Sequence, residues 1–228
     1  EMQRSLVGSE MCIRDRIPLT KEQLSGKVLI HFGAVDYESH VFVNGKKAGV
    51  HRGGYTSFCY DITELCHQGK NRLTVYAADD NRQGKQPRGK QSERFDSHDC
   101  DYTRTTGIWQ TVWLEFVPTS YVKSVKYYPN CAAGTLAVQA ELCGAGEFSV
   151  EASFEGRFCG SACAHGENGM VTVTLALSEI HLWEAGEGNL YDLVLRFGED
   201  RVKSYAGLRE IRIDGMRVLL NGRPVFQR

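Results

Sequence analysis

The feature that most constrains the fold is a strict alternation of apolar and polar side chains in four segments of the second half of the chain. These segments cover residues 136–142, 148–154, 171–177 and 191–197. In an extended strand successive side chains point to opposite faces, so each segment predicts a strand with one buried and one solvated face. Several short strands of this kind, separated by glycine-containing turns, are typical of an immunoglobulin-like sandwich of two sheets.

The first half of the chain also predicts strands. Asn44-Gly45 is the strongest hairpin signal, because both residues tolerate the positive φ angles of a type I′ turn. From Ile108 to Val117 large apolar groups occupy both faces, including Trp109 and Trp113. This pattern predicts a central strand buried on both faces, with both indoles in the core. Stacking of these indoles on a sugar ring is the alternative interpretation.

A long polar segment without periodicity, residues 79–102, precedes this strand. Loops of this length in compact domains are usually functional or disordered. The segment ends shortly before Gly107, so Asp101 is expected at the mouth of the sandwich, a position that suits binding.

The two ends of the chain do not follow the strand pattern. Residues 1–16 have neither strand nor helix periodicity and are interpreted as an aberrant or disordered leader. Residues 17–26 are interpreted as a short polar linker. Residues 211–228 contain two short strand-like runs, too little sequence for a domain.

Composition excludes several classes of protein. A net charge of -1 over 228 residues gives no reason to expect a nucleic-acid partner. There is no run of about 18 apolar residues and no secretory signal, so we expect no membrane association and favour a cytoplasmic location. Eight irregularly spaced cysteines predict free thiols buried as small hydrophobes rather than a disulfide framework.

Short motifs along the chain resemble glycoside hydrolase family 2. In the first half these are Val35-Asp36-Tyr37, Val43-Asn44-Gly45, His51-Arg52-Gly53-Gly54-Tyr55, Asp61-Ile62-Thr63, the string from Gln86 to Gln91 and the string from Thr106 to Glu115. Farther on they are Leu190-Tyr191-Asp192-Leu193, the string from Tyr205 to Ile211 and the string from Leu219 to Pro224. The motifs occur in the family's order and cover nearly everything from Ile17 on, which makes the resemblance specific.

The resemblance implies an enzyme of the β-galactosidase or β-glucuronidase type, in which all-β domains precede a (β/α)8 barrel. We therefore expect a sugar-binding jelly-roll (galactose-binding-like) β-sandwich at 17–118 without its first strands, and an immunoglobulin-like β-sandwich at 119–209. The start of a truncated barrel is expected at 210–228. A barrel needs about 250 residues, so the chain is interpreted as an N-terminal fragment whose partner is the missing catalytic barrel of the same protein.

The family's retaining chemistry uses two carboxyl groups about 5 Å apart, and no position here matches its catalytic motifs. Glu147 and Glu151 are more simply solvated strand charges, as Glu184 and Glu187 are loop charges. We therefore expect no catalytic residue and no turnover in this chain.

Binding of a carbohydrate substrate is the expected remaining role, with Asp101, Arg88 and Lys90 as candidate residues. At Asp101 the resemblance implies a carboxylate that holds sugar hydroxyls and a monovalent cation, and an Asx turn is the alternative. Arg88 and Lys90 could meet the carboxylate of an acidic sugar or of a neighbouring loop, and solvated charges are the alternative.

No cofactor and no metal are expected in the chain itself. Cys159, Cys163 and His165 are interpreted as incidental, since structural zinc wants four ligands. A monovalent or divalent cation and assembly into a homo-oligomer belong to the full-length parent. Two other functions fit the same patterns: a stand-alone carbohydrate-binding module, and a two-sandwich structural or adhesion protein.

Overall fold

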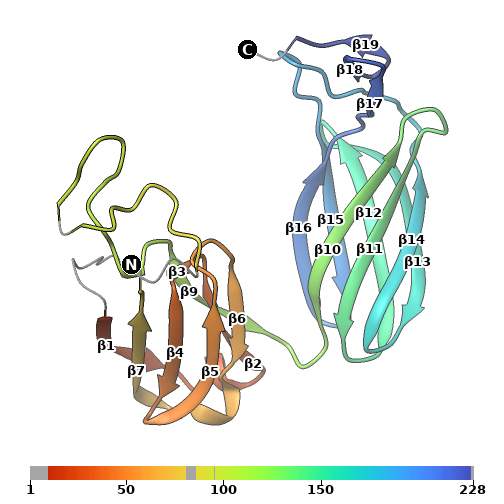
Figure 1. Cartoon of the computed structure of the whole chain (residues 1–228). Coiled ribbons are helices and arrows are strands. Elements are labelled where there is room, and N and C mark those ends of the chain that lie inside the picture. The colour runs from red at the N-terminus through yellow and green to blue at the C-terminus, as the bar shows by residue number, and fades with distance from the viewer. Residues whose placement is uncertain (1–9, 81–85, 95, 227–228) are drawn as a thin grey trace. The chain divides into compact units, whose positions relative to one another are not determined.

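A computed structural model describes residues 10–80, 86–94 and 96–226 of the chain (Figure 1). The chain divides into two compact units, Glu1–Val117 (unit 1) and Pro118–Arg228 (unit 2). Unit 1 contains two short 3-10 helices, η1 (Glu22–Leu24) and η2 (Thr63–Leu65), and all the strand ladders of both units are antiparallel. The prediction of an all-β fold made of β-sandwiches is confirmed.

Unit 1 packs a four-stranded sheet, in the order β1-β7-β4-β5, against a three-stranded sheet, in the order β6-β2-β9, and adds a short β3–β8 pair. The strands are β1 (Glu10–Leu19), β2 (Lys27–Phe32), β3 (Val35–Asp36), β4 (Glu38–Val43), β5 (Lys46–Arg52), β6 (Phe58–Asp61), β7 (Gly69–Ala78), β8 (Gly107–Ile108) and β9 (Val112–Val117). One core cluster joins the two sheets, with Ile30 and Phe32 from β2 meeting Val41 from β4 and Val75 from β7.

The hairpin predicted at Asn44-Gly45 is confirmed. Strand β4 ends at Val43 and β5 begins at Lys46, so these two residues form the turn. Their φ angles are 52° and 81°, the positive values that a type I′ turn requires.

The prediction that residues 1–16 are a leader without structure is wrong for the part that the structure describes. Residues 10–19 form β1, which pairs with β7 from Glu10 opposite Ala78 to Leu19 opposite Gly69. The strand lies at the edge of its sheet and exposes Arg14, Asp15 and Arg16 to solvent. The partly buried Ile13 and Ile17 pack on the core, and Leu19 at the end of the strand is buried. The alternation is interrupted by Asp15, which lies between Ile13 and Ile17 on the same face of the strand, and this interruption explains the error.

The prediction of a buried central strand after Ile108 is also wrong. Strand β9 is an edge strand that pairs with β2, and Trp113 is 45% exposed. The Trp113 indole lies on the outer face of the sheet and stacks on His31, with ring centroids 4.9 Å apart and an interplanar angle of 4°. Strand β9 therefore has apolar side chains on both faces, although Trp113 on its outer face is exposed to solvent.

Unit 2 is a sandwich of a three-stranded sheet, in the order β10-β11-β14, and a four-stranded sheet, in the order β13-β12-β15-β16. The strands are β10 (Tyr121–Asn130), β11 (Thr135–Cys143), β12 (Gly146–Phe154), β13 (Arg157–Gly166), β14 (Gly169–Ala176), β15 (Tyr191–Phe197) and β16 (Asp200–Ala206). The predicted alternation is confirmed: Phe148, Val150 and Leu195 are buried, whereas Glu147 and Glu151 face solvent.

A small sheet follows the sandwich, made of β17 (Ile211–Asp214), β18 (Arg217–Leu220) and β19 (Arg223–Pro224). Asn221 ties it down, because its side chain accepts a hydrogen bond from the Glu210 N–H and donates one to the Trp183 carbonyl oxygen, at 2.9 and 3.0 Å. The start of a barrel at 210–228 stays a prediction.

All eight cysteines are free thiols, but only Cys159 is buried. Cys12, Cys59, Cys100 and Cys163 are exposed, so the expectation that the thiols serve as small core hydrophobes is wrong for most of them. Cys12, Cys59 and Cys163 point outward from their strands and Cys100 lies in the long loop, which composition alone does not indicate.

Candidate functional site

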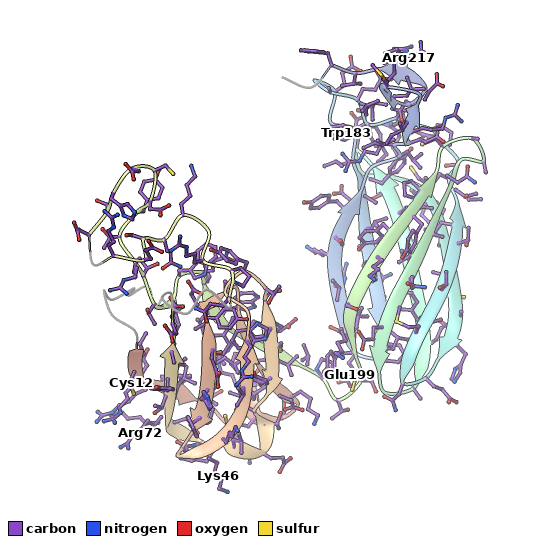
Figure 2. The ribbon with its side chains drawn as sticks, viewed as in Figure 1. Cys12, Lys46, Arg72, Trp183, Glu199 and Arg217 are labelled. Atoms are coloured by element: carbon purple, nitrogen blue, oxygen red, sulfur yellow. The ribbon has the colours of Figure 1, made fainter. Side chains whose placement is uncertain are left out.

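A pocket of about 330 Å³ lies in unit 1 beside the long loop that joins β7 to β8. Figure 2 shows polar and aromatic side chains gathered around this loop. The residues that line the pocket come from β3, the β5–β6 connection, the loop itself and the β8–β9 connection: Asp36, Tyr55, Arg88, Lys90, Gln91, Tyr102, Thr103, Thr105 and Trp109. A concave site with a few converging polar groups among aromatic rings is the usual form of a small-ligand site.

Backbone hydrogen bonds between its two limbs give the described part of the loop a defined course. The Tyr102 N–H donates to the Lys90 carbonyl oxygen, and the Ser92 N–H donates to the Tyr102 carbonyl oxygen, both at 2.7 Å. Lys90, Gln91 and Tyr102 are thereby held side by side at the pocket.

Asp36, at the end of β3, anchors the loop from below. Its side chain is buried, the residue being only 5% exposed. Gln91 Nε2 donates to Asp36 Oδ2 at 2.6 Å, and Gln91 Oε1 accepts from the Thr105 N–H at 2.9 Å, so one amide joins the carboxyl group to both limbs. The other oxygen, Oδ1, has no hydrogen-bond partner among the residues that the structure describes.

Burial raises the pKa of the Asp36 carboxyl above its ordinary value, and the hydrogen bond from Gln91 opposes this by lowering it. When the pKa of a carboxyl group is higher in the folded state than in the unfolded state, the protein becomes less stable as the pH rises. The free energy of unfolding falls between the pKa of the unfolded state and the pKa of the folded state.

Asp36→Asn is therefore expected to raise the free energy of unfolding at pH 7, because it removes a charge that burial disfavours while its amide oxygen can still accept the hydrogen bond from Gln91. The difference from the wild type should shrink as the pH falls toward the ordinary aspartate range. Urea unfolding at several pH values measures this, and a stability gap that stays constant with pH would contradict it.

Two aromatic rings form a wall of the pocket. Trp109 is 39% exposed, and its Nε1 donates to the Gly54 carbonyl oxygen at 2.7 Å. Tyr55 meets it edge to face, with ring centroids 5.9 Å apart and an interplanar angle of 69°. Burial raises the pKa of the Tyr55 hydroxyl, and the negative charges of Asp36 and Asp79 raise it further. Tyr55 is therefore a neutral hydroxyl at physiological pH, able to donate a hydrogen bond.

The predicted site residues are divided by the structure. Arg88 and Lys90 line the pocket. Arg88 Nη1 lies 3.5 Å from Glu93 Oε2, so the two side chains form an ion pair. Asp101 is not one of the described lining residues. Its carboxylate lies 4.0 Å from His98 Nε2, in a turn where the backbones of the two residues exchange hydrogen bonds.

Sequence reasoning did not identify four of the pocket residues, and it assigned Trp109 to the core. The four are Asp36, Tyr55, Gln91 and Tyr102. Asp36 and Gln91 belong to motifs of the family resemblance, which was the available signal. Their side chains bond although they are 55 positions apart in sequence, a pairing that no local pattern indicates.

The other candidates do not form sites in the part of the chain that the structure describes. His51, which belongs to a motif of the family resemblance, stacks on Phe58, with ring centroids 4.2 Å apart, and forms a hydrogen bond with Thr56 Oγ1. No group of three or more His, Cys, Asp or Glu side chains suited to a metal occurs among the described residues. No described helix is long and apolar enough to cross a membrane.

Residues 8–118 match the model of the family described as glycosyl hydrolases family 2, sugar binding domain. The chain is similar to a putative β-glucuronidase from Formosa agariphila, with 29% identity over 85% of this chain and 25% of that protein. It is also similar to β-galactosidases from Thermoanaerobacter pseudethanolicus (36% identity over 44% of this chain and 13% of that protein) and Clostridium acetobutylicum (28% over 77% and 19%). The chain spans a quarter or less of the length of these curated relatives.

Among solved structures, the chain resembles a β-glucuronidase from Ruminococcus gnavus in complex with uronic deoxynojirimycin. The TM-score is 0.73 at 24% identity, over 96% of this chain and 39% of that one. At this level of identity the likeness shows the fold, a succession of β-sandwiches.

Proposed function

Because the chain belongs to glycosyl hydrolases family 2 through its sugar-binding domain, we propose that the pocket of unit 1 binds a carbohydrate for a retaining β-glycosidase. The whole protein would hydrolyse a terminal β-glucuronide or β-galactoside. In this proposal the immunoglobulin-like sandwich of unit 2 is a scaffold between the sugar-binding domain and a catalytic barrel.

The observation that carries the proposal is the composition of the pocket within the domain that matches the family model. A pyranose ring has apolar C–H faces, which pack on aromatic rings, and hydroxyl groups, which exchange hydrogen bonds with polar side chains. Trp109, Tyr55 and Tyr102 supply the rings, whereas Lys90 and Arg88 supply cations that suit ring hydroxyls or a uronate carboxylate.

The carboxyl groups at the pocket support a non-catalytic role for this chain. A retaining glycosidase needs two of them about 5 Å apart, and Asp36 is the one carboxyl residue among the described residues that line it. Glu151, one of the candidate glutamates, lies 3.6 Å from Arg196 on the solvent face of unit 2. We therefore expect the chain alone to release no nitrophenol from nitrophenyl β-glucuronide or nitrophenyl β-galactoside.

Trp109→Ala is expected to weaken sugar binding about tenfold, equivalent to about 1.4 kcal/mol, because it removes one ring of the pocket wall. Titration calorimetry with glucuronic acid and with galactose measures the affinity of each variant. Trp113→Ala is the matched control, since Trp113 is similarly exposed but stacks on His31 away from the pocket. Equal affinities of the two variants, or no binding of either sugar by the wild type, would remove the pocket from consideration.

A further inference from the structure

Unit 1 has a second hollow, of about 340 Å³, beside the turn between β4 and β5. Figure 2 places Lys46, the first residue after that turn, at the end of unit 1 opposite the long loop, and Arg72 close to the same end. Three cationic side chains and no carboxylate belong to its described lining: Arg16, Asn44, Gly45, His67, Lys70, Asn71 and Arg72. We call this feature the basic hollow.

The cations of the basic hollow are brought together by strand register. Arg16 of β1 lies directly opposite Arg72 of β7. Lys70 lies two positions from Arg72 on the same strand, and therefore on the same face. All three residues are exposed. Like charges directly opposite each other on a sheet repel and destabilise the pair.

A second pair of opposed arginines in the chain has a carboxylate beside it. Arg196 lies opposite Arg201 in the β15–β16 ladder, and there Glu151 Oε2 approaches Arg196 Nη1 to 3.6 Å. Arg16, Lys70 and Arg72 make no ion pair with any residue that the structure describes. Asp15, the adjacent acid, accepts a hydrogen bond from the Arg16 backbone N–H at 2.6 Å.

The floor of the basic hollow is rigid, because two asparagine side chains bond to each other and to the backbone around them. Asn71, only 1% exposed, accepts hydrogen bonds at Oδ1 from Asn44 Nδ2 and from the His67 N–H, at 2.8 and 2.9 Å. Asn44 Oδ1 in turn accepts from the Arg72 N–H at 2.8 Å. The backbone that carries Arg72 is thus fixed before any ligand arrives, which lowers the ordering cost of binding.

We propose that the basic hollow is a binding site for a sulfate or phosphate group carried by a saccharide or free in solution. Arginine guanidinium groups present forked donors that match the oxygens of such groups, and a lysine adds a point charge. An oxyanion between Arg16 and Arg72 would replace their repulsion by attraction. The proposal rests on residues separate from those of the sugar pocket.

Titration calorimetry on the 228-residue chain tests this with inorganic sulfate, inorganic phosphate, glucose 6-sulfate, glucose 6-phosphate and glucose, each at matched ionic strength in chloride. We expect binding of the anions and esters but not of glucose. A preference between the sulfate and phosphate esters identifies the natural group, and binding of the inorganic ions without either ester points to a free ion. Arg72→Gln should weaken binding at least tenfold. Arg201→Gln, in the other opposed pair, should stay within twofold of the wild type.

Arg72→Lys separates charge from geometry and should give an intermediate affinity, because it keeps the cation without the fork. Without added sulfate or phosphate, Arg72→Gln should melt at or above the wild-type temperature, since it removes a repulsion. Absence of anion binding by the wild type, unchanged affinity in Arg72→Gln, or a fall in affinity that accompanies a lowered melting temperature would each overturn the proposal.

Discussion

Gly54→Ala is expected to abolish sugar binding by unit 1 and to lower its free energy of unfolding by about 1–3 kcal/mol, the usual cost of an added methyl group in a closed space. A Cβ atom at Gly54 would lie 2.4 Å from Asp36 Oδ1 and 2.9 Å from Asp36 Cγ. Neither side can move freely, because Gln91 holds the Asp36 carboxyl group and Trp109 Nε1 holds the Gly54 carbonyl oxygen. Relief of the clash would displace the groups that shape the pocket.

The double variant Asp36→Ala, Gly54→Ala distinguishes a clash from a general loss of structure. It removes the carboxyl group that the new Cβ would meet, so it should recover stability relative to Gly54→Ala without recovering sugar binding. Gly188→Ala is the control for the substitution itself, since a Cβ there meets nothing nearer than Trp183 Nε1 at 3.7 Å. Wild-type sugar affinity in Gly54→Ala would contradict the prediction.

Phe197→Ala is expected to lower the free energy of unfolding of unit 2 by about 3–5 kcal/mol, through lost burial and the cavity left behind. Phe197 has no exposed surface and lies directly opposite Phe148 in the β12–β15 ladder. The cavity would therefore open inside the sandwich core. Hydrogen-bonded ladders hold the surrounding strands, so these strands cannot move far enough to fill it.

Guanidinium unfolding followed by tryptophan fluorescence measures this effect. Trp183 is the one tryptophan of unit 2, so a background with Trp109→Phe and Trp113→Phe makes the signal report that unit. Phe158→Ala is the matched control, because Phe158 is 62% exposed on β13 and its removal should change stability by less than about 0.5 kcal/mol. A loss below 1 kcal/mol for Phe197→Ala would contradict the assignment of Phe197 to the core.

The sandwich of unit 2 could be predicted because four of its strands, β11, β12, β14 and β15, show a regular alternation of apolar and polar side chains. Burial in β12 and β15 alternates residue by residue. The neighbours of Phe148 and Phe197 in sequence are therefore enough to assign both side chains to the buried face. The Asn44-Gly45 turn is local in the same sense, since its backbone angles depend on two residues. Arg88 and Lys90 were assigned to a long polar loop for a local reason too, namely the length and polarity of that segment.

Errors arose wherever the answer depended on what lies across the sheet. Strand β1 was missed because its place at an edge lets Arg14 and Arg16 face solvent. Trp109 and Trp113 were assigned to the core because they are apolar. Residue type alone does not indicate whether another layer of the structure covers a side chain. Asp36 was not predicted as a pocket residue because its place there depends on contacts with Gln91 and Gly54, both distant in sequence.

By itself the sequence determined the strand periodicity, the tight turns and the resemblance to a family, since each of these depends on neighbouring residues or short motifs. The tertiary structure alone decided which strands are edges, which indoles are exposed, and which polar groups converge. It formed the pocket by placing Gln91 of the long loop against Asp36, and it formed the basic hollow by setting Arg16 opposite Arg72. The physical reason is that strand register and loop closure are long-range properties: they bring together side chains whose separation along the chain carries no sign of their proximity in space.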